Sequence, residues 1–312
     1  MKVHTDIERL PRFRNAVITI GTFDGVHTGH KQVIAQLKEE AERIHGESVI
    51  ITFHPHPRRI VGSGQSKDIK LINSQNEKAE LLSDAGVDHL VVVPFTHTFA
   101  ALSAKEYVKD FLVEKFHPHT IIIGYDHRFG QGRTGDYHLM ETYGQEFGFI
   151  VREIPVHVLD AISVSSTRIR HAIESGEIET ANHLLGYTFF FDAKVVEGNK
   201  LGRTIGYPTA NLEAEETEKI IPSNGVYAVD VDLMNEEIHG KRLKGMMNIG
   251  VRPTVGGTRR VIEVNIFEFD GDLYGKTIRV YVKKRLRDEK KFDGLESLKK
   301  QLADDRLQAL NL

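Results

Sequence analysis

The hydrophobic pattern of the chain changes near Gly186, and this change divides the sequence into two kinds of fold. Before it, short apolar runs rich in Val, Ile and Phe alternate with longer amphipathic segments, which is typical of β-α-β units and a parallel sheet. After it, strand-like segments are separated by Gly, Asn and Pro turns, which indicates an antiparallel sheet or a small barrel. The sequence therefore predicts an α/β domain over residues 1–185 and a mostly β domain over residues 186–312.

The individual elements follow from the same periodicities. In the first domain we expect strands over residues 16–23, 47–53, 89–95, 119–126 and 149–159, and helices over residues 30–44, 76–86, 103–116 and 165–176. The last of these helices is expected to open at a cap formed by Ser165, Ser166 and Thr167. In the second domain we expect strands over residues 189–198, 225–233, 242–251, 260–269 and 276–286, with a closing amphipathic helix around residues 295–303.

Composition narrows the possible functions. The 312 residues are 40% hydrophobic and 27% charged, as in ordinary globular proteins with a sizeable core. A net charge of −3 argues against a bulk nucleic-acid or membrane-surface binder. Cysteine is absent, which excludes disulfides, thiolate zinc sites and Cys nucleophiles, and no apolar run approaches the ~20 residues of a membrane-spanning helix. We expect a cytoplasmic protein with neither nucleic-acid nor membrane partners, and the sequence leaves its oligomeric state open.

The sharpest motif of the first domain is GTFDGVHTGH, residues 21–30, between a buried strand and an amphipathic helix. Ligands of parallel sheets bind outside the carboxyl ends of strands, and a helix start there offers free backbone N–H groups to a phosphate. His27 and His30 are three residues apart, so a first helical turn would place both imidazoles on one face. There they could bind phosphate oxygens and stabilise charge on an α-phosphorus. The alternative is a tight turn with two surface histidines.

Three further segments of this domain follow a strand or open a helix. FHPHP, residues 53–57, is held stiff by its prolines, which lowers the cost of ordering a contact with a ligand. Residues 121–136 form a strand and then a glycine-rich loop, whose arginines could cover phosphates or a nucleobase. This loop contains Asp126, Arg128, Phe129 and Arg133. VSSTRIR, residues 164–170, is the third segment. Taken singly, the three are explained as a rigid turn, a flexible loop and a helix cap.

Together and in this order, the four motifs resemble the FAD synthetase module of the prokaryotic bifunctional riboflavin kinase/FAD synthetase family. The resemblance covers about residues 15–185. The HxGH part is shared by many adenylyltransferases, whereas the set of four is specific. It implies a Rossmann-like nucleotidyltransferase fold and adenylyl transfer from ATP to FMN with release of pyrophosphate. Since the FMN phosphate oxygen is already anionic, this reaction requires no general base.

The resemblance also implies roles for single residues. His27 and His30 would contact the ATP phosphates and act with Arg168 in catalysis. The other residues implied in ATP binding are Gly21, Phe23, Asp24, Gly29, Asp126, Ser166 and Thr167. Asp126 would also lie near the metal ion. The residues implied in flavin binding are Phe53, His54, Pro55 and Phe129.

The second domain carries GRTIGYPTAN, residues 202–211. In an extended stretch Thr209 and Asn211 face the same side, and their hydroxyl and amide oxygens are hard ligands that suit Mg²⁺ shared with phosphates. The alternative is a strand-entry loop with local hydrogen bonds. Glu263 lies among apolar strand residues, where a carboxylate is either a surface residue of the alternate face or a general base. The basic run Lys283–Lys291 is typical of a solvated face.

With NGVYAV, MNIGVRPTVGG and DLYGK added, these segments resemble riboflavin kinase, a small β-barrel transferase, over about residues 186–306. The resemblance implies that Glu263 activates the riboflavin 5′-hydroxyl for attack on the γ-phosphorus of ATP. It implies ATP binding by Gly202, Thr209 and Asn211, with Mg²⁺ on Thr209 and Asn211, and flavin binding by Arg252 and Arg287.

Two positions depart from the pattern of this family. Asn265 stands two residues after Glu263, where His is frequent, and an alternating strand points both side chains to the same side. We expect this change to shift the kinase optimum without abolishing activity. Tyr207 replaces the commoner Phe, which is a mild change.

The sequence as a whole predicts a bifunctional enzyme of flavin cofactor synthesis. Its substrates would be riboflavin, FMN and ATP, with ATP consumed in both steps and Mg²⁺ as the cofactor. One alternative is an adenylyltransferase for a different acceptor with a degenerate kinase domain, and another is a flavin- or nucleotide-binding regulator without turnover. The presence of all the chemical side chains argues against both, namely His27, His30, Thr209, Asn211 and Glu263.

Overall fold

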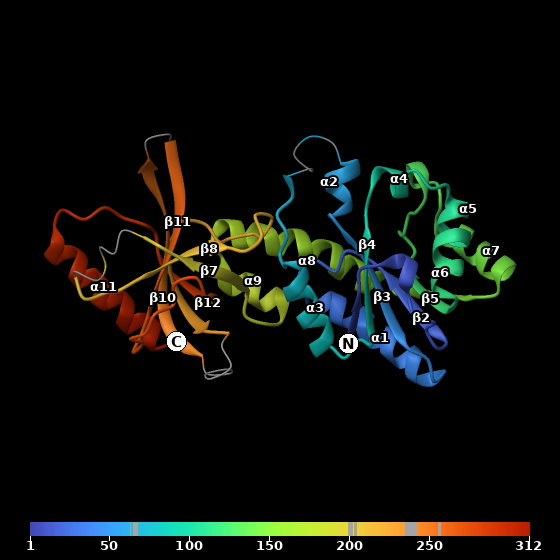
Figure 1. The fold of residues 1–312 in the computed structure, drawn as a ribbon, viewed down its shortest axis with the longest axis horizontal. Helices are drawn as coiled ribbons and strands as arrows, with labels where there is room; N and C mark the ends of the chain where they lie inside the picture. The colour runs from blue at the N-terminus through green and yellow to red at the C-terminus, as the bar shows by residue number, and fades with distance from the viewer. Residues whose placement is uncertain (63, 65–67, 199–201, 203–204, 235–241, 255–256) are drawn as a thin grey trace. The chain divides into compact units, whose positions relative to one another are not determined.

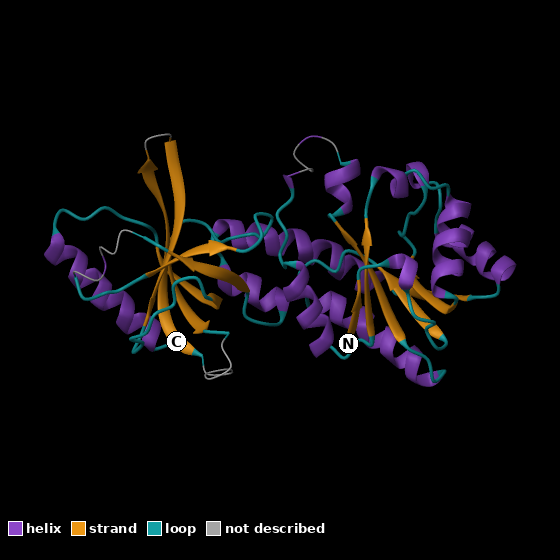
Figure 2. Cartoon of the chain, viewed as in Figure 1, coloured by secondary structure: helices purple, strands orange, loops and turns teal. Residues whose placement is uncertain are grey.

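The computed structural model describes the 312-residue chain except for residues 63, 65–67, 199–201, 203–204, 235–241 and 255–256, and it does not describe the side chains of residues 157, 159–165, 252–254 and 257–259. The chain forms two compact units (Figures 1 and 2). The first holds Met1–Lys70 and Gln75–Ser166, and the second holds Leu71–Ser74 and Thr167–Leu312.

The first unit is built on a parallel sheet of six strands in the order β1-β4-β3-β2-β5-β6. The strands are β1 (Lys2–His4), β2 (Ala16–Ile20), β3 (Ser48–His54), β4 (His89–Pro94), β5 (Pro118–Gly124) and β6 (Ile150–Ile154). Strands β2 and β3 are buried almost throughout because helices cover both faces of the sheet, which explains their continuous apolar runs. The predicted α/β fold is confirmed. Strand β1 was not predicted, because three residues with largely exposed side chains leave no periodic signal.

Helices pack on both faces of this sheet (Figure 2). The helices of residues 28–175 are α1 (Thr28–Arg43), α2 (Pro57–Val61), α3 (Gln75–Asp84), α4 (His97–Ala100), α5 (Ala104–Glu106), α6 (Glu114–Phe116), α7 (Tyr137–Phe147) and α8 (Val156–Ser175), the last of which continues into the second unit. Short helical turns cover Ile7–Arg9 and Gln131–Arg133, and a π-helical segment, Tyr107–Val113, joins α5 to α6. Helix α1 buries Val33, Ile34 and Leu37 against the sheet, as its apolar stripe predicts.

One predicted helix boundary is wrong. The helix expected to open at Ser165–Thr167 is the second half of α8, which begins at Val156. Strand β6 ends at Ile154 rather than near residue 159, because Pro155 follows and its carbonyl accepts a hydrogen bond from the backbone N–H of Val158 in a turn that starts the helix. Ser166 and Thr167 therefore lie inside a helix and do not cap one. The side chain of Ser165 is outside the described part.

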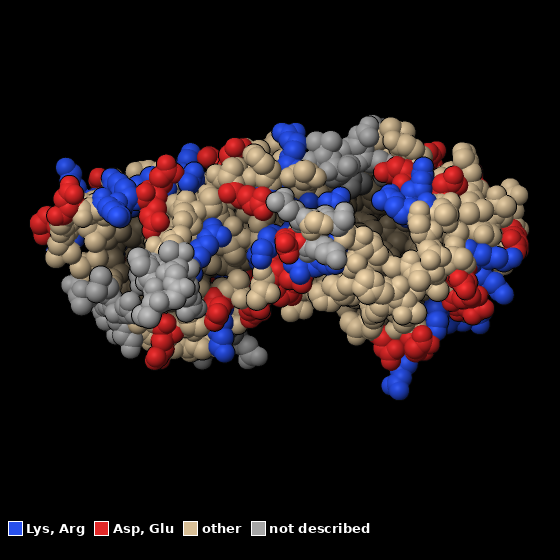
Figure 3. Space-filling model, turned by 90° about the horizontal axis from the view of Figure 1, so that it is seen from above, with Lys and Arg blue, Asp and Glu red and all other residues tan. Residues whose placement is uncertain are grey.

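The direction of strand addition reverses between β2 and β5. The chain runs from β2 to β3 and β4 on one side of the sheet, and then returns to β5 and β6 on the other. At such a reversal a ligand crevice forms outside the carboxyl ends of the strands. The loops that follow β2 and β5 carry the motifs of residues 21–30 and 124–136. Figure 3, which views the molecule from above, shows a hollow in this part of the surface, with positive and negative side chains intermixed around it.

The second unit is a closed barrel with the strand order β10-β11-β8-β7-β12-β9, and every pairing is antiparallel. Its strands are β7 (Phe190–Val196), β8 (Ala210–Ala214), β9 (Gly225–Asp232), β10 (Leu243–Thr254), β11 (Gly257–Ile266) and β12 (Thr277–Arg287). Helices α9 (Ile178–Leu185) and α11 (Leu295–Leu310) flank the barrel in sequence. The predicted small barrel and terminal helix are confirmed, and the helix extends to Leu310 rather than ending near residue 303.

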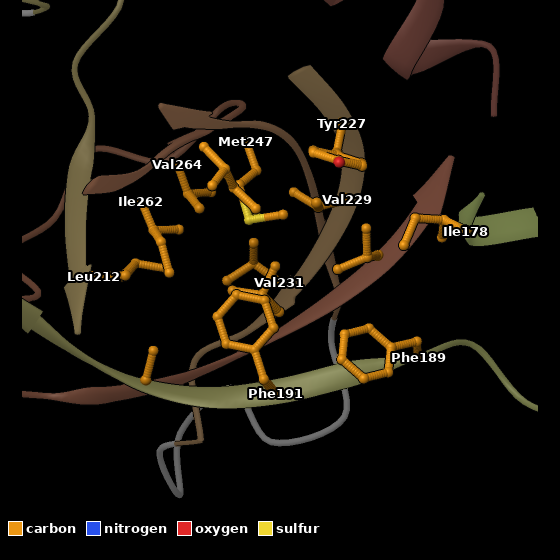
Figure 4. Close-up of a cluster of buried hydrophobic side chains, with 14 of the residues drawn as sticks. Ile178, Phe189, Phe191, Leu212, Tyr227, Val229, Val231, Met247, Ile262 and Val264 are labelled. Carbon is orange, nitrogen blue, oxygen red and sulfur yellow. The ribbon is translucent and has the colours of Figure 1, made fainter. Parts of the chain in front are cut away.

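Inward-pointing residues of the barrel strands form a single apolar core (Figure 4). Its members include Phe191, Leu212, Val229, Val231, Met247, Ile262 and Val264. Ile173 of α8 and Leu185 of α9 join this same core. The second half of α8 and the whole of α9 therefore belong to the compact unit of the barrel, and the domain limit predicted after residue 185 stays a prediction. Within the described residues, no helix is long and apolar enough to span a bilayer.

Candidate active sites

The GTFDGVHTGH loop joins β2 to α1 through a strained turn. Phe23, Gly25 and Val26 have φ angles of 46°, 93° and 36°. A positive φ at a residue other than glycine costs about 1–3 kcal/mol, and such strain concentrates at ligand-binding sites. The turn places His27 at the N-cap of α1 and buries both His27 and His30.

The two histidines form a stacked pair linked to α8. Their ring centroids are 3.9 Å apart, so the predicted shared face is confirmed. The backbone N–H of His30 donates to Nδ1 of His27 at 3.4 Å, and Nε2 of His27 lies 2.9 Å from Oγ of Ser166. Since Nδ1 accepts, a neutral His27 carries its proton on Nε2 and donates it to Ser166. Ser166 Oγ in turn donates to the carbonyl oxygen of Asp24 at 3.5 Å. Residues from two separate motifs thus converge.

The other residues predicted to bind ATP divide into two groups. Gly21, Asp24 and Gly29 lie in the same loop, with Asp24 and Gly29 buried, and a Cβ built on Gly21 would lie 3.1 Å from the ring of Phe23. Thr167 and Arg168 are exposed on α8 and belong to the second compact unit. Their roles stay predictions.

The loop after β5 is closed on itself by a short antiparallel pairing between Phe129 and Gly135. The backbones of Phe129 and Gly135 exchange two hydrogen bonds, at 3.1 and 2.9 Å, and a Cβ at Gly135 would overlap the ring of Phe129. The side chain of Phe129 is buried and stacks on Tyr107, with ring centroids 5.3 Å apart. Asp126 is exposed at the start of the loop. The structure therefore places Phe129 in the wall of the first unit, and the flavin contact predicted for it remains untested.

The FHPHP segment ends β3 beside other aromatic rings. Phe53 is partly exposed, and its ring centroid lies 5.4 Å from that of Phe95 and 5.7 Å from that of Phe99. His54 is exposed and precedes Pro55 through a cis peptide bond. Sequence reasoning missed Phe95 and Phe99. Phe95 directly follows β4 and Phe99 lies in α4 just beyond it, at the carboxyl edge that also carries Phe53, and this position was the available signal.

In the second unit, Glu263 of β11 lies directly opposite Asn211 of β8. Side chains opposed in this way on antiparallel strands have Cβ atoms about 4.5–5.5 Å apart. Two glycines make room for the predicted metal ligands. A Cβ on Gly198 would overlap the amide of Asn211, and a Cβ on Gly202 would overlap the carbonyl oxygen of Tyr207 and lie 3.4 Å from Oγ1 of Thr209. The structure thus brings Asn211 opposite Glu263 and places Thr209 in the lining of the same cavity as Glu263, while their roles in metal binding and catalysis stay predictions.

Two cavities meet at Thr209. The smaller, of about 300 Å³, has Glu263, Asn265 and Arg287 in its lining, together with apolar side chains that include Met246, Leu298 and Leu302. The larger, of about 680 Å³, is lined by Pro208 and Thr209 on one side and by residues 269–274 on the other. The site therefore offers separate spaces on either side of Thr209, one of them next to the carboxylate of Glu263.

Asn265 lines the same cavity as Glu263, as its position two residues further along the strand predicts. Its side chain is buried, and its Nδ2 atom donates to the carbonyl oxygen of Pro208 at 2.6 Å. This bond ties β11 to the turn immediately before Thr209. The expected shift of the kinase optimum stays a prediction.

Arg287 faces the cavity, but each of its three nitrogens already donates a hydrogen bond within the protein. Its Nε lies 3.0 Å from both carboxylate oxygens of Asp305, Nη2 lies 2.8 Å from Oδ2 of Asp305, and Nη1 donates to the carbonyl oxygen of Asp288 at 2.9 Å. Asp305 lies on α11 and is completely buried. The ion pair fixes α11, which carries Leu298 and Leu302 of the cavity wall. A direct flavin contact by Arg287 stays a prediction, and the side chain of Arg252 is outside the described part.

Glu289 is a second carboxylate in the lining of the smaller cavity that sequence reasoning missed. Its side chain packs against Gly250 so closely that a Cβ there would overlap it. The sequence analysis assigned the run Lys283–Lys291 to a solvated face. Glu289 lies beyond the end of β12, where strand alternation no longer indicates orientation.

Known proteins match both units. Residues 10–168 match the family model of FAD synthetase, and residues 185–312 match that of riboflavin kinase. A bifunctional riboflavin kinase/FMN adenylyltransferase of Escherichia coli (strain K12) is 38% identical over 94% of this chain and 91% of the relative. A protein of the same name from Buchnera aphidicola subsp. Acyrthosiphon pisum is 33% identical over 98% of this chain and 96% of the relative. A crystal structure described as a macrolide-efflux protein from Streptococcus pneumoniae has a TM-score of 0.86 and 31% identity, over 100% of this chain and 99% of the other.

Proposed function

Since this chain belongs to the family of bifunctional riboflavin kinase/FMN adenylyltransferases, we propose that its two activities reside in two separate sites, one built around Glu263 and one around His27 and His30. The enzyme phosphorylates riboflavin with ATP to give FMN, and it transfers an adenylyl group from a second ATP to FMN to give FAD and pyrophosphate. The observation that carries the kinase assignment is the position of Glu263, which shares the smaller cavity with Thr209 and lies directly opposite Asn211 on the neighbouring strand.

In the kinase site, the smaller cavity receives riboflavin and the larger receives the nucleoside part of ATP. Three observations support this arrangement. Glu263 lies in the smaller cavity, where the reacting hydroxyl must be. Met246, Leu298 and Leu302 provide an apolar wall for a flat tricyclic ring. Thr209 borders both spaces, where the γ-phosphate must meet the acceptor.

Phosphoryl transfer then needs one proton transfer. The carboxylate of Glu263 accepts the proton of the riboflavin 5′-hydroxyl as its oxygen attacks the γ-phosphorus, and ADP leaves with the electrons of the broken P–O bond. Asn265 holds the backbone of Pro208 and so positions Thr209 next to the phosphates. The amide of Asn211 faces Glu263 across the strand pair and sets the distance between the base and the phosphate groups.

In the adenylyl-transfer site, a phosphate oxygen of FMN attacks the α-phosphorus of ATP, and pyrophosphate leaves. The nucleophile is already charged, so the protein contributes by orientation and charge stabilisation. His27 and His30 bind the phosphates at the N-terminus of α1, where the helix dipole adds to their effect. Ser166 holds His27 in orientation through Nε2.

Mg²⁺ is the cofactor that this donor set suits. Among the described residues, no group of three or more His, Asp or Glu side chains could hold a metal ion by itself. The oxygens of Thr209 and Asn211, for which Gly198 and Gly202 leave room, are hard ligands for an ion that shares its remaining positions with ATP phosphates. Bound there, the ion would neutralise triphosphate charge.

The metal assignment predicts a change in Mg²⁺ dependence. Asn211→Ala removes one proposed ligand, so the Mg²⁺ concentration for half-maximal FMN formation should rise about tenfold. FAD formation from supplied FMN by the same variant is the internal control and should keep its Mg²⁺ dependence. Rate measurements over a magnesium titration check both. An unchanged requirement in the kinase step would remove Asn211 from the metal site, and full turnover in excess chelator would remove the metal from the mechanism.

The Arg287–Asp305 ion pair predicts a change in riboflavin affinity. Asp305→Asn keeps the shape of the side chain but leaves the guanidinium without its charged partner, so α11 should lose its fixed position beside the cavity. The KM for riboflavin is expected to rise about tenfold, while FAD formation from FMN is unchanged. Asp304→Asn, at the exposed neighbouring position, is the matched control. Equal KM values for the two variants would contradict a role of α11 in binding riboflavin.

The function as a whole is tested by chromatography of riboflavin, ATP and Mg²⁺ incubated with the pure protein. FMN should rise first and then decline as FAD accumulates. FMN without FAD would contradict the assignment of the first unit, and FAD formation only from supplied FMN would contradict that of the second.

A further inference from the structure

One buried polar group of the first unit has no part in the two reactions as described so far. His127 follows Asp126 in the loop after β5, and its Nε2 atom is buried without a hydrogen-bond partner among the residues that the structure describes. Burial, with Arg128 and Arg133 nearby, lowers the pKa of His127 to about 4. The imidazole is therefore neutral near pH 7, and its Nε2 can donate or accept a hydrogen bond according to the tautomer.

Such an atom is costly for the ligand-free protein. A buried donor or acceptor without a partner destabilises a fold by about 1–3 kcal/mol. Native proteins contain few of them, and each calls for a reason such as a ligand or a functional constraint. A phenyl ring at position 127 would fill a similar volume beside Phe129 without this cost, since His127 already stacks on that ring with centroids 6.0 Å apart.

The location of His127 indicates which part of a ligand it meets. It lies beyond the carboxyl end of β5, next to the reversal between β5 and β2 where ligands of such sheets bind. A row of ring contacts runs from it through Phe129, Tyr107 and Phe99 to Phe53, with centroid separations of 5.3, 6.0 and 5.7 Å after the first step. The phosphate-binding histidines instead contact Phe23 and α8.

We propose that His127 determines specificity for the flavin ring in the adenylyl-transfer site, by a hydrogen bond from its Nε2 to a polar edge of the isoalloxazine of FMN. The proposal rests on the function assigned above, in which FMN is the acceptor. Phe129 and Tyr107 are buried within the row, whereas Phe53 and Phe99 at its far end are partly exposed, and their rings match an extended tricyclic ring better than the smaller adenine. The carbonyl and imide groups of the isoalloxazine offer both acceptors and a donor to a neutral imidazole.

The test compares three substitutions. His127→Phe removes the hydrogen bond and keeps the ring, so the KM for FMN should rise about tenfold while kcat and the KM for ATP stay close to those of the unaltered enzyme. At position 127 the side-chain amide of Gln would lie about as far from the backbone as Nε2 of the imidazole does. The shorter side chain of Asn would place its amide only about as far out as Nδ1. His127→Gln should therefore recover most of the affinity, and His127→Asn should not. His138→Phe, at an exposed position of α7, is the matched control.

A second measurement separates recognition from a structural role. Without ligand, the melting temperature of His127→Phe should equal or exceed that of the unaltered protein, because the substitution removes an unpartnered buried atom. A lower melting temperature with an unchanged KM for FMN would overturn the proposal. A rise in the KM for ATP alone would also overturn it and assign the contact to adenine.

Failure of the proposed function is distinguishable from failure of this inference. If the unaltered protein formed no FAD from FMN and ATP, the proposed function would fail. Direct titration with FMN, followed by quenching of its fluorescence, would still report whether His127→Phe binds it about tenfold more weakly. Equal binding by the two proteins would overturn the inference whatever the activity.

Discussion

Glu263→Gln should lower the rate of FMN formation by about 10²–10⁴-fold, the range typical of removing a general base. The amide of Gln has nearly the same shape as the carboxylate, so the contact across to Asn211 and the cavity lining should persist. What is lost is the ability to accept the proton of the riboflavin hydroxyl. Initial rates from riboflavin and ATP, with FMN separated by chromatography, measure the effect.

The second reaction of the same enzyme is the control for this variant. FAD formation from supplied FMN should continue at the unaltered rate, because Glu263 lies in the barrel and the histidine pair lies in the other compact unit. Glu268→Gln, at an exposed position just beyond β11, should affect neither reaction. Parallel loss of both activities in Glu263→Gln would contradict separate sites, and normal FMN formation would show that Glu263 is not the base.

His30→Ala should produce the opposite pattern, with FAD formation reduced by about 10²–10³-fold and FMN formation unchanged. The imidazole is buried against His27 and Phe23 at the start of α1, so its loss removes a donor where charge develops on the phosphates. Rates of FAD formation from FMN and ATP measure the loss.

Two further variants serve as controls for this prediction. His138→Ala on α7 removes an exposed imidazole and should leave both rates unchanged. His30→Asn retains a hydrogen-bond donor near the same place and should recover part of the activity if the donor, rather than packing, is what matters. FAD formation by His30→Ala at the normal rate would remove His30 from the mechanism.

The local motifs were predictable because each depends on a few neighbouring residues within one turn or one strand. The histidine pair of residues 27 and 30 depends on one turn between a strand and a helix, and the alternation of β11 placed Asn265 on the same side as Glu263. The same local reasoning failed at Ser165–Thr167. A run of Ser and Thr is typical of a helix cap, but Pro155 had already ended the strand and allowed the helix to begin nine residues earlier.

Features that depend on distant contacts could not be predicted. The partner of Arg287 is Asp305, 18 positions away on another element, so the arginine was interpreted as a ligand contact. The unpartnered Nε2 of His127 depends on how its loop packs in the tertiary structure, which no periodicity of the loop encodes. Glu289 and the apolar residues of α11 form part of a cavity only because the terminal helix docks beside the barrel.

The closed barrel has a consequence for how the kinase half can change during evolution. Within the closed ring each strand has two hydrogen-bonded neighbours, so the ring presents no open edge to which an added segment could attach as a further strand, whereas the β10–β11 hairpin beyond Ile249 is paired on one side alone. Inserted sequence is accommodated in the turns at the two ends of the ring instead. New substrate preferences in this half would therefore arise by lengthening or replacing those turns, while the strands that hold Asn211 and Glu263 opposite one another are inherited unchanged.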